Sequence, residues 1–106
     1  MIVSILTRHT RMMERAAWEA ALGTVLSKIH KVLEAAPGFV SVRYLWGTDE
    51  PGHIAQITVW QSEDDCRRYV REGDAAMVAT IEDAAVPTAA YPNGSWVRQT
   101  FSAIEG

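Results

Sequence analysis

The sequence predicts an α+β domain whose elements follow the order strand, helix, strand, strand, helix, strand. Three observations support this prediction. The chain has 106 residues, which is a common length for one domain. Short segments near its start, middle and end are rich in β-branched and apolar side chains, as strands are. Between them, apolar residues recur at three- and four-residue steps, which is the period of an amphipathic helix.

Composition and charge exclude several kinds of partner. The net charge is −3 and the isoelectric point is about 5.5, so the clustered basic excess of a nucleic-acid-binding protein is absent. No apolar run approaches the roughly 18 residues of a membrane span, and Met1–Thr7 lacks the basic start of a signal peptide. We therefore expect a soluble, cytoplasmic protein that binds neither nucleic acid nor membrane.

The cysteine and histidine content predicts no metal centre. Cys66 is the single cysteine, so it has no partner for a disulfide within the chain. The sequence has no CxxC motif and no Cys/His cluster with the spacing of metal ligands. We therefore expect neither an internal disulfide nor a bound metal.

The first predicted strand covers residues 2–9, and a long helix follows it. The helix extends from Met13 to Ala35, is weakened by Gly23, and is ended by the Pro-Gly pair at residues 37 and 38. Its apolar side is formed by Trp18, Leu22, Val25, Leu26, Ile29, Val32 and Leu33.

A hairpin follows this helix. Phe39–Trp46 and His53–Trp60 are separated by the turn-forming segment Gly47-Thr48-Asp49-Glu50-Pro51-Gly52, so we expect the two strands to pair antiparallel. The last strand, Ser95–Ile104, follows a loop from Pro87 to Gly94.

The second helical region begins with a capping box. The Ser62 hydroxyl and the Asp65 carboxylate are expected to bond amides of the first turn, and the helix ends at Arg71 or Glu72. Gly73 interrupts it, and a continuation over Ala75–Ala84 can be capped by Asp74. One side of the continuation carries Met77, Val78 and Ile81. The resulting order is the ferredoxin-like βαββαβ motif, a four-stranded antiparallel sheet with its helices on one face, in a single domain over residues 1–106.

Alternation along the strands assigns their side chains to two faces, because residues two apart point the same way. We expect the more apolar face to lie under the helices. It comprises Val3, Ile5, Thr7, His9, Val40, Val42, Tyr44, Trp46, His53, Ala55, Ile57, Val59, Val97, Gln99, Phe101 and Ala103. The opposite, mixed face comprises Ser4, Leu6, Arg8, Ser41, Arg43, Leu45, Gln56, Thr58, Trp60, Trp96, Arg98, Thr100 and Ser102. Two helices cover only one side of such a sheet, so we expect the mixed face to form a homodimer interface.

Three segments resemble the antibiotic biosynthesis monooxygenase (ABM) family of the dimeric α/β-barrel superfamily. They are Pro37-Gly38-Phe39 before a strand, then Ile57-Thr58-Val59-Trp60-Gln61-Ser62-Glu63-Asp64 at the end of the third strand, and then a helix containing Tyr69. The resemblance spans nearly the whole chain. It implies a dimeric α/β barrel, with a homodimer formed through the sheet face.

The resemblance also implies a function. Members of this family are small oxygenases that use no metal, flavin or haem and oxidise electron-rich aromatic or polyketide-like substrates with molecular oxygen. A deprotonated phenol or anthrone can itself pass an electron to oxygen, so such an enzyme binds the substrate, moves a proton and holds the anion in a dry site. The implied protein has no cofactor, and its ligand is a small aromatic molecule.

A haem-degrading branch of the superfamily is a poor match. That branch uses an Asn on the first strand, a Trp in the second helix and a His about ten residues later. Here the first strand has no Asn, Tyr69 takes the Trp position and Ala79 lies near the His position.

The predicted small-molecule site lies between the apolar face and the helices. His9 is the expected general base, since imidazole titrates near neutral pH. Tyr44 and Tyr69 are expected to hydrogen-bond a substrate oxygen or an oxyanion. The side chains expected to bind the substrate are Trp18, Trp46, His53, Met77, Gln99 and Phe101.

Most of these residues also have a purely structural interpretation. His9 can end its strand in water without a role, and His53 can be exposed beside the turn. Tyrosines are common in small cores, and Trp60 and Trp96 suit an interface. Structural roles are also expected for Arg43 and Arg98 as interface charges, Glu82 and Asp83 as an exposed helix end, and Cys66 as a small packing residue.

Two other functions fit the same sequence. One is a non-catalytic barrel that binds a small ligand without turnover. The other is a polyketide cyclase or isomerase, in which His9 or Tyr44 moves protons and oxygen takes no part. Oxygen uptake, anaerobic turnover and ligand binding without turnover distinguish the three.

Overall fold

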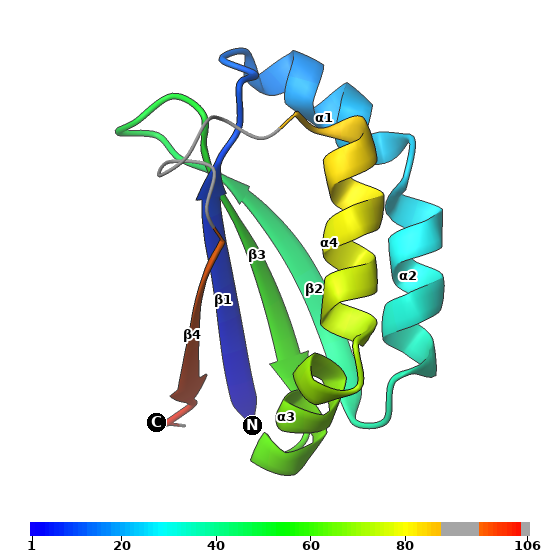
Figure 1. The fold of residues 1–106 in the computed structure, drawn as a ribbon. Coiled ribbons are helices and arrows are strands. Elements are labelled where there is room, and N and C mark those ends of the chain that lie inside the picture. Colours follow the sequence, from blue (N-terminus) through cyan, green and yellow to red (C-terminus); the bar gives the residue numbers. More distant parts are fainter. Residues whose placement is uncertain (88–95, 105–106) are drawn as a thin grey trace.

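Four strands form one antiparallel sheet with the order β2-β3-β1-β4 in the computed structural model, which describes residues 1–87 and 96–104 (Figure 1). This order and the βαββαβ connectivity confirm the predicted α+β, ferredoxin-like fold. The strands are β1 (Ile2–His9), β2 (Phe39–Trp46), β3 (His53–Trp60) and β4 (Val97–Ser102). The first three have the predicted bounds, and β4 is shorter than predicted.

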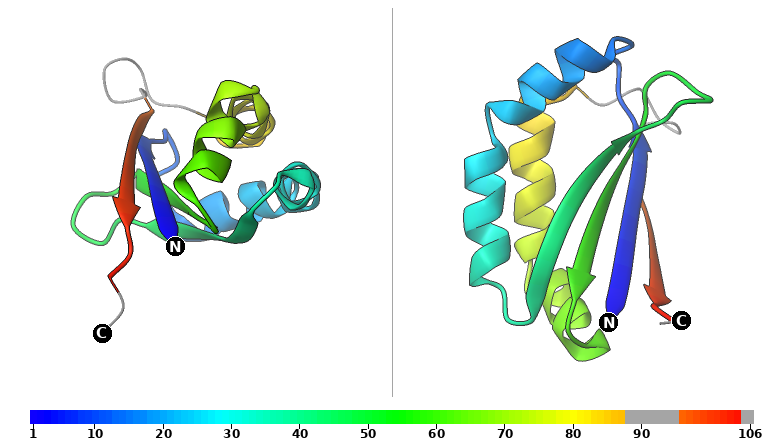
Figure 2. Two further views of the ribbon diagram at one scale, coloured as in Figure 1. Left: turned by 90° about the horizontal axis from the view of Figure 1, so that it is seen from below. Right: turned by 180° about the vertical axis from the view of Figure 1, so that it is seen from behind.

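The part of the chain that the structure describes contains four helices: α1 (Arg15–Gly23), α2 (Leu26–Ala35), α3 (Glu63–Arg71) and α4 (Asp74–Ala85). All of them lie on one side of the sheet (Figure 2). None is both long and apolar enough to cross a membrane. The predicted loop from Pro87 to Gly94 is described only at Pro87. Its other residues lie outside the described residues, as does Ser95, the predicted start of the last strand.

The predicted single helix from Met13 to Ala35 is two helices. α1 ends after Gly23, and Val25 leaves helical geometry with ψ at −3°. The hydroxyl of Thr24 donates to the carbonyl of Ala21 at 2.6 Å, which helps to satisfy the free end of α1. The break lets α1 cross the end of the sheet while α2 runs beside α4 (Figure 1).

The second helical region is divided as predicted, at Gly73. The Ser62 hydroxyl accepts from the Asp65 amide at 3.1 Å, as expected of a capping residue. The Asp65 carboxylate accepts from that same hydroxyl at 2.8 Å, not from a first-turn amide. Asp74 is the first residue of α4, and Gly73, with φ at 91°, takes the capping position predicted for Asp74.

The assignment of faces from the sequence was wrong for β1, β3 and β4. Along β1 and β3 the residues of the predicted mixed face are the buried ones, and those of the predicted apolar face are partly exposed. β2 was assigned correctly from Val42 to Trp46, because Val42, Tyr44 and Trp46 pack against the helix-covered core. Val40, also predicted under the helices, is 41% exposed, because the strand shifts register there and Phe39 packs against the core instead. The covered face therefore carries Ser4, Leu6, Arg8, Val42, Tyr44, Trp46, Ile54, Gln56, Thr58, Trp60, Trp96 and Arg98.

A shift in strand pairing explains part of this error. Trp46 pairs with Ile54 and not with His53, and the register also shifts between Phe39 and Ser41. A displacement of one residue moves every side chain of a strand to the other face. Trp60 and Trp96, predicted at the dimer interface, lie on the covered side, and Trp60 is fully buried.

The uncovered face is the more apolar one. Val3 pairs with Val59 and Ile5 with Ile57 along the centre of the sheet, and all four are partly exposed. At the β4 edge, Val97 and Phe101 are about half exposed. We call this surface the open face; it consists of Val3, Ile5, Thr7, His9, Ser41, Arg43, Leu45, His53, Ala55, Ile57, Val59, Val97, Gln99 and Phe101.

Candidate functional site

A buried ion-pair network lies beneath the helices. The Arg8 guanidinium on β1 is 1% exposed and donates to the Glu82 carboxylate at 3.1 Å and to the Val86 carbonyl at 3.4 Å, and it also pairs with Asp83. The guanidinium carbon lies 4.2 Å from the centre of the Trp96 ring. Glu82 is also 1% exposed, so the expectation of an exposed helix end is wrong for this residue. The network joins the covered face of the sheet to the end of α4.

Tyr44 and Gln56 extend the polar region across the sheet. These residues are cross-strand partners, and the Gln56 amide donates to the Tyr44 hydroxyl at 2.9 Å. Burial and the nearby Glu82 charge raise the pKa of Tyr44. Burial also raises the pKa of Glu82, and the Arg8 charge offsets that shift only in part. Titratable groups with shifted pKa values in one region are a common mark of a functional site.

Tyr69 and Arg98 form a second polar group nearer to the β4 edge. Arg98 donates to the Ser4 hydroxyl at 2.7 Å, and its guanidinium carbon lies 5.9 Å from the centre of the Tyr69 ring. The Tyr69 hydroxyl is buried and has no hydrogen-bond partner among the described residues. Burial raises the pKa of Tyr69, so its phenol is protonated at neutral pH and can act as a hydrogen-bond donor.

Two hollows line the passage between β4 and the helices. One has a volume of about 250 Å³ and is bounded by Leu6, Trp96, Arg98 and three alanines of α4. The other has a volume of about 280 Å³ and lies between α3 and β4, where Cys66, Val70 and Thr100 contribute to its wall. Because Arg98 borders both, we treat them as one feature and call it the β4 groove.

Trp96 connects the buried network to the β4 groove, because its ring lies against the Arg8 guanidinium and also borders the groove. Ala75, Ala79 and Glu82 are separated by four and three residues, so they lie on one face of α4. Arg8 is two residues from Leu6 and therefore on the same face of β1. The groove thus offers an apolar and aromatic wall and a cation that borders both hollows, with a buried carboxylate on the adjoining face of α4. This combination suits a planar molecule with an acidic hydroxyl.

The predicted catalytic and binding residues fall into two groups. Tyr44, Tyr69, Trp18 and Trp46 lie on the covered side, as expected, with the two tryptophan rings 5.3 Å apart. His9, His53, Gln99 and Phe101 lie on the open face, so their expected position under the helices is corrected. Met77 belongs to neither group: it is 53% exposed on α4, and Val78 takes the buried position beside it.

Sequence reasoning did not place Arg8, Arg98 and Glu82 at the site. Arg98 was expected at the dimer interface, but it lies on the covered side against Ser4. One signal was available: Glu82 follows an alanine-rich apolar stretch of α4 three residues beyond Ala79, a position on the buried side of that helix. The partner of Glu82, Arg8, is 74 residues away in the chain, so only the strand and helix packing could show the pair.

Cys66 is a buried free thiol at the groove wall, which agrees with the expected packing role. Burial raises the pKa of Cys66, so the thiol form is favoured over the nucleophilic thiolate. The thiol therefore contributes shape to the groove and not reactivity.

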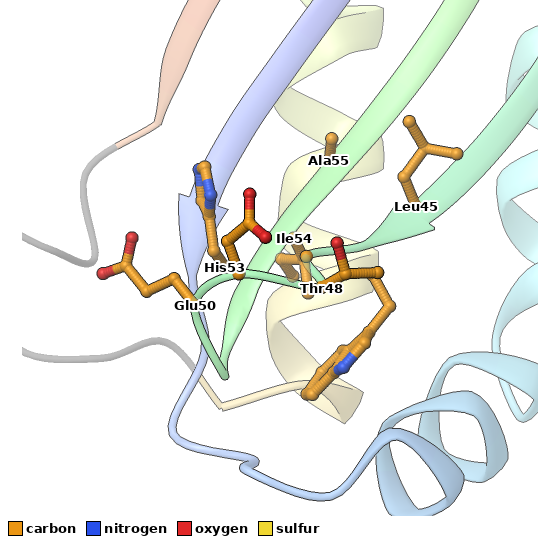
Figure 3. Close-up of a pocket in the computed structure, with 9 residues that line it drawn as sticks. Leu45, Thr48, Glu50, His53, Ile54 and Ala55 are labelled. Atoms are coloured by element: carbon orange, nitrogen blue, oxygen red, sulfur yellow. The ribbon is translucent and has the colours of Figure 1, made fainter.

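A third hollow, of about 500 Å³, lies at the hairpin loop between β2 and β3 (Figure 3). It is bounded by Leu45, Thr48, Glu50, His53 and neighbouring residues of the loop. It is larger than either hollow of the β4 groove, but neither Tyr44, Tyr69 nor any residue of the buried network lines it. We therefore assign the candidate site to the β4 groove.

Comparisons with known structures agree with this fold. SnoaB, a cofactor-independent oxygenase from Streptomyces nogalater, is 21% identical, with a TM-score of 0.61 over 99% of this chain and 95% of SnoaB. The ActVA-Orf6 monooxygenase of Streptomyces coelicolor, in complex with nanaomycin D, is 16% identical, with a TM-score of 0.70 over 99% of this chain and 88% of that chain. Rv0793 from Mycobacterium tuberculosis is 11% identical, with a TM-score of 0.60 over 99% and 96%. Identities this low establish the fold alone.

These structures place the protein in the class of small ferredoxin-like α+β proteins that includes cofactor-independent oxygenases. The family model for antibiotic biosynthesis monooxygenases matches residues 5–80, which is most of the chain. The chain therefore belongs to the antibiotic biosynthesis monooxygenase family, as the sequence resemblance implied. No curated protein matches the sequence significantly.

Proposed function

We propose that this protein is a cofactor-independent monooxygenase that oxidises a small aromatic or polyketide-like substrate with molecular oxygen in the β4 groove. Membership of the family supports the monooxygenase class. The observation that carries the site assignment is the position of Arg98, a cation that borders both hollows of the groove beside a buried, protonated tyrosine. The reaction needs no metal, flavin or haem in this proposal.

Arg98 is proposed to bind the acidic oxygen of the substrate as an anion. A guanidinium has five N–H donors, and one of them is donated to Ser4, which orients the group. A positive charge next to a phenol or enol lowers its pKa, so the substrate binds in the electron-rich, deprotonated form. Tyr69 is proposed to donate to the same oxygen, and Trp96 to stack on the aromatic ring.

Glu82 is proposed to accept the substrate proton. Burial raises the pKa of Glu82, which makes it a stronger base than an ordinary glutamate, and Arg8 holds Glu82 in place. Tyr44 is proposed to support this position through its contact with Gln56 and its closeness to Glu82. The reaction balances for an anthrone: its CH₂ group and O₂ give a carbonyl group and water, with both electron pairs supplied by the substrate.

Oxygen uptake with a panel of anthrones and hydroquinones, with a chelator and without flavin, tests the proposal. We expect uptake with at least one substrate, and one atom of labelled oxygen in the product. Arg98→Met should lower kcat/KM by about 10²-fold or more, the usual scale for loss of a group that stabilises a developing anion. The matched control is Arg15→Met, since Arg15 is an exposed arginine paired with Glu19 on α1.

A second variant tests the base. Glu82→Gln keeps the shape of the side chain and should lower kcat while removing the acid limb of the pH–rate profile. Turnover that continues without oxygen would favour a cyclase or isomerase. Binding detected by tryptophan fluorescence without turnover of any panel member would favour a ligand-binding protein.

We also propose that two protomers associate through their open faces. The apolar side chains of β1, β3 and β4 that face away from the helices support this proposal, because monomers rarely leave such a surface in water. The proposed dimer uses the residues of the open face, not the mixed set expected from the sequence. Each protomer would then keep its own β4 groove on the opposite side of the sheet.

A further inference from the structure

The open face carries a second group of side chains, away from the β4 groove. His9 ends β1 and His53 begins β3, and the two residues are direct cross-strand partners. Their rings are stacked, with centroids 4.7 Å apart and planes inclined by 13°. The His9 Nε2 atom lies 2.9 Å from a carboxylate oxygen of Glu50 in the hairpin loop. One ligand atom from each of the three residues lies within 4.8 Å of the others.

We propose that His9, His53 and Glu50 bind a divalent transition-metal ion, with Zn²⁺ as the reference ion. Two imidazole nitrogens and one carboxylate oxygen are a common three-ligand set for zinc, and the fourth position is then open to water. Ligands around a tetrahedral zinc ion are about 3.4 Å apart, given bond lengths near 2.1 Å. One pair of ligand atoms is already closer than this, at 2.9 Å, and no pair is more than 4.8 Å apart, so binding requires the side chains to rotate toward the ion.

The main chain holds the three residues in register. The His53 amide donates to the Glu50 carbonyl at 3.1 Å, and the Gly47 amide donates to the His53 carbonyl at 2.7 Å. The Thr10 amide, next to His9, donates to the Gly52 carbonyl at 2.8 Å. The loop that carries Glu50 is therefore attached to both strands that carry the histidines, which lowers the entropic cost of binding.

Gly52 makes this close attachment possible. Its φ is +82°, and a Cβ atom at this position would lie 2.8 Å from the carbonyl oxygen of Thr10. Any other residue would strain the loop or push it away from β1. The arrangement that brings Glu50 toward His9 thus depends on a residue without a side chain.

Charge and exposure also suit a metal ion. In the protomer the side chain of His9 is 25% exposed and that of Glu50 is 62% exposed. The His9–His53 pair is the last of the β1–β3 register, at the hairpin-loop end of the open face, so an ion can reach it from the edge of the proposed dimer interface. Asp49 borders the same hollow as Glu50 and His53 and adds negative charge to it. Imidazole ligands favour zinc, nickel, cobalt and copper over magnesium and calcium, which prefer sites made only of oxygen atoms.

Sequence spacing could not predict this site. His9 and His53 are 44 positions apart, and no short motif links them. The antiparallel pairing of β1 with β3 brings them together, and the β2–β3 loop then adds Glu50. The site lies on the open face, so it is independent of the proposed reaction in the β4 groove.

The test is a titration of the metal-stripped full chain with Zn²⁺ by calorimetry, and with Co²⁺ by visible absorption. We expect one Zn²⁺ per chain, ligand-field bands of low-symmetry Co²⁺, and little heat with Mg²⁺. His9→Asn and His53→Asn should each weaken Zn²⁺ binding at least tenfold, and the double variant should abolish it. Glu50→Gln, in an exposed loop position, should weaken binding without any effect on folding.

The matched control is His30→Asn. His30 is an exposed histidine on α2 whose Nδ1 atom lies 3.7 Å from the Glu34 carboxylate, so it is a histidine–glutamate pair without a second imidazole. Its replacement should leave the zinc affinity unchanged. The proposal is overturned if the native chain binds no Zn²⁺ at micromolar protein concentration, or if the three site variants bind as tightly as the native chain. Circular dichroism of each variant confirms that a lost signal is not unfolding.

Discussion

Several single residues on the covered face are charged or hydrogen-bonding, in a place where core residues are usually apolar. Their polar atoms are mostly satisfied by one another: Arg8 by Glu82, Asp83 and Val86, Trp60 by Thr58, and Arg98 by Ser4. The sequence predicted Tyr44 and Tyr69 on the helix-covered side, because tyrosine side chains are often buried in protein cores. It did not predict the buried charges there, because an arginine or a glutamate is expected at the surface unless a buried partner is known.

Arg8→Met should destabilise the fold by about 3–5 kcal/mol, since it leaves the buried Glu82 without its main cation. The loss should be smaller at pH 5 than at pH 8. Burial already raises the pKa of Glu82, and without Arg8 a larger fraction is protonated and uncharged at the lower pH. Urea unfolding at a fixed protein concentration measures both effects.

Two controls make the Arg8 experiment specific. Arg15→Met removes an exposed i,i+4 pair with Glu19 and should change stability by no more than about 0.5 kcal/mol. Combining Arg8→Met with Glu82→Leu should recover much of the loss, because Asp83, with its side chain 43% exposed, stays solvated. A double variant no more stable than Arg8→Met would contradict this account of the network.

Tyr44 and Tyr69 should ionise above the ordinary tyrosine pKa of about 10, because burial raises the pKa of both. The folded state keeps its phenol protons where the unfolded state begins to lose them, so stability should fall as the pH rises beyond about 10. Tyrosinate absorbance during an alkaline titration measures the ionisation. Tyr44→Phe and Tyr69→Phe should each remove tyrosinate absorbance only from the part of the titration curve above the ordinary tyrosine pKa of about 10. If either variant instead lost absorbance near pH 10, that tyrosine would be accessible to water.

At the scale of helices and strands, local sequence chemistry was a good guide to bounds. Three strands begin and end as predicted, because turn residues and the Pro37-Gly38 pair mark where neighbouring elements end. Alternation also showed correctly which residues of β1, β3 and β4 share a face, but it failed at the start of β2, where the register shift interrupts it. It could not show how the faces of different strands match, because the register between β2 and β3 depends on the loop and on the shift near Phe39.

Gly23 and Gly73 provide a matched test of how glycine divides the two helical regions. An added Cβ atom would meet nothing within 4 Å at either position, but only Gly73 has a positive φ, of +91°. Gly23→Ala should therefore stabilise the protein by about 0.5–1 kcal/mol, since alanine is the better helix former. Gly73→Ala should destabilise it by about 1–2 kcal/mol, the cost of left-handed backbone for a residue with a Cβ atom. Thermal and urea unfolding check both signs; the same sign for both variants would contradict the backbone argument.

At the scale of the whole molecule, one sheet has two faces of different chemistry and only one layer of helices (Figure 2). The sequence was sufficient to predict that helices cover only one face of the sheet (Figure 2). That a second protomer covers the other face stays a prediction. The assumption that the more apolar face belongs under the helices was the error. Here the helices cover the face that carries the buried polar groups, and the more uniformly apolar face is left outside, where association can bury it.

If two protomers associate through their open faces, the protein in solution should have twice the mass of one chain. The native chain should sediment at twice its 11.7 kDa at micromolar concentration. Ile57 lies at the centre of the open face, paired with Ile5, so Ile57→Asp places a charge where two protomers would meet and should give a monomer. Phe101→Glu, at the β4 edge and already 49% exposed in the protomer, should weaken the dimer with little effect on the fold of the protomer. Met77→Asp is the control, because Met77 is an apolar residue of similar exposure on α4, on the other side of the sheet, and it should leave the dimer intact. A monomeric native chain, or an Ile57→Asp variant that remains dimeric with native circular dichroism, would show that the apolar open face is not where two copies meet.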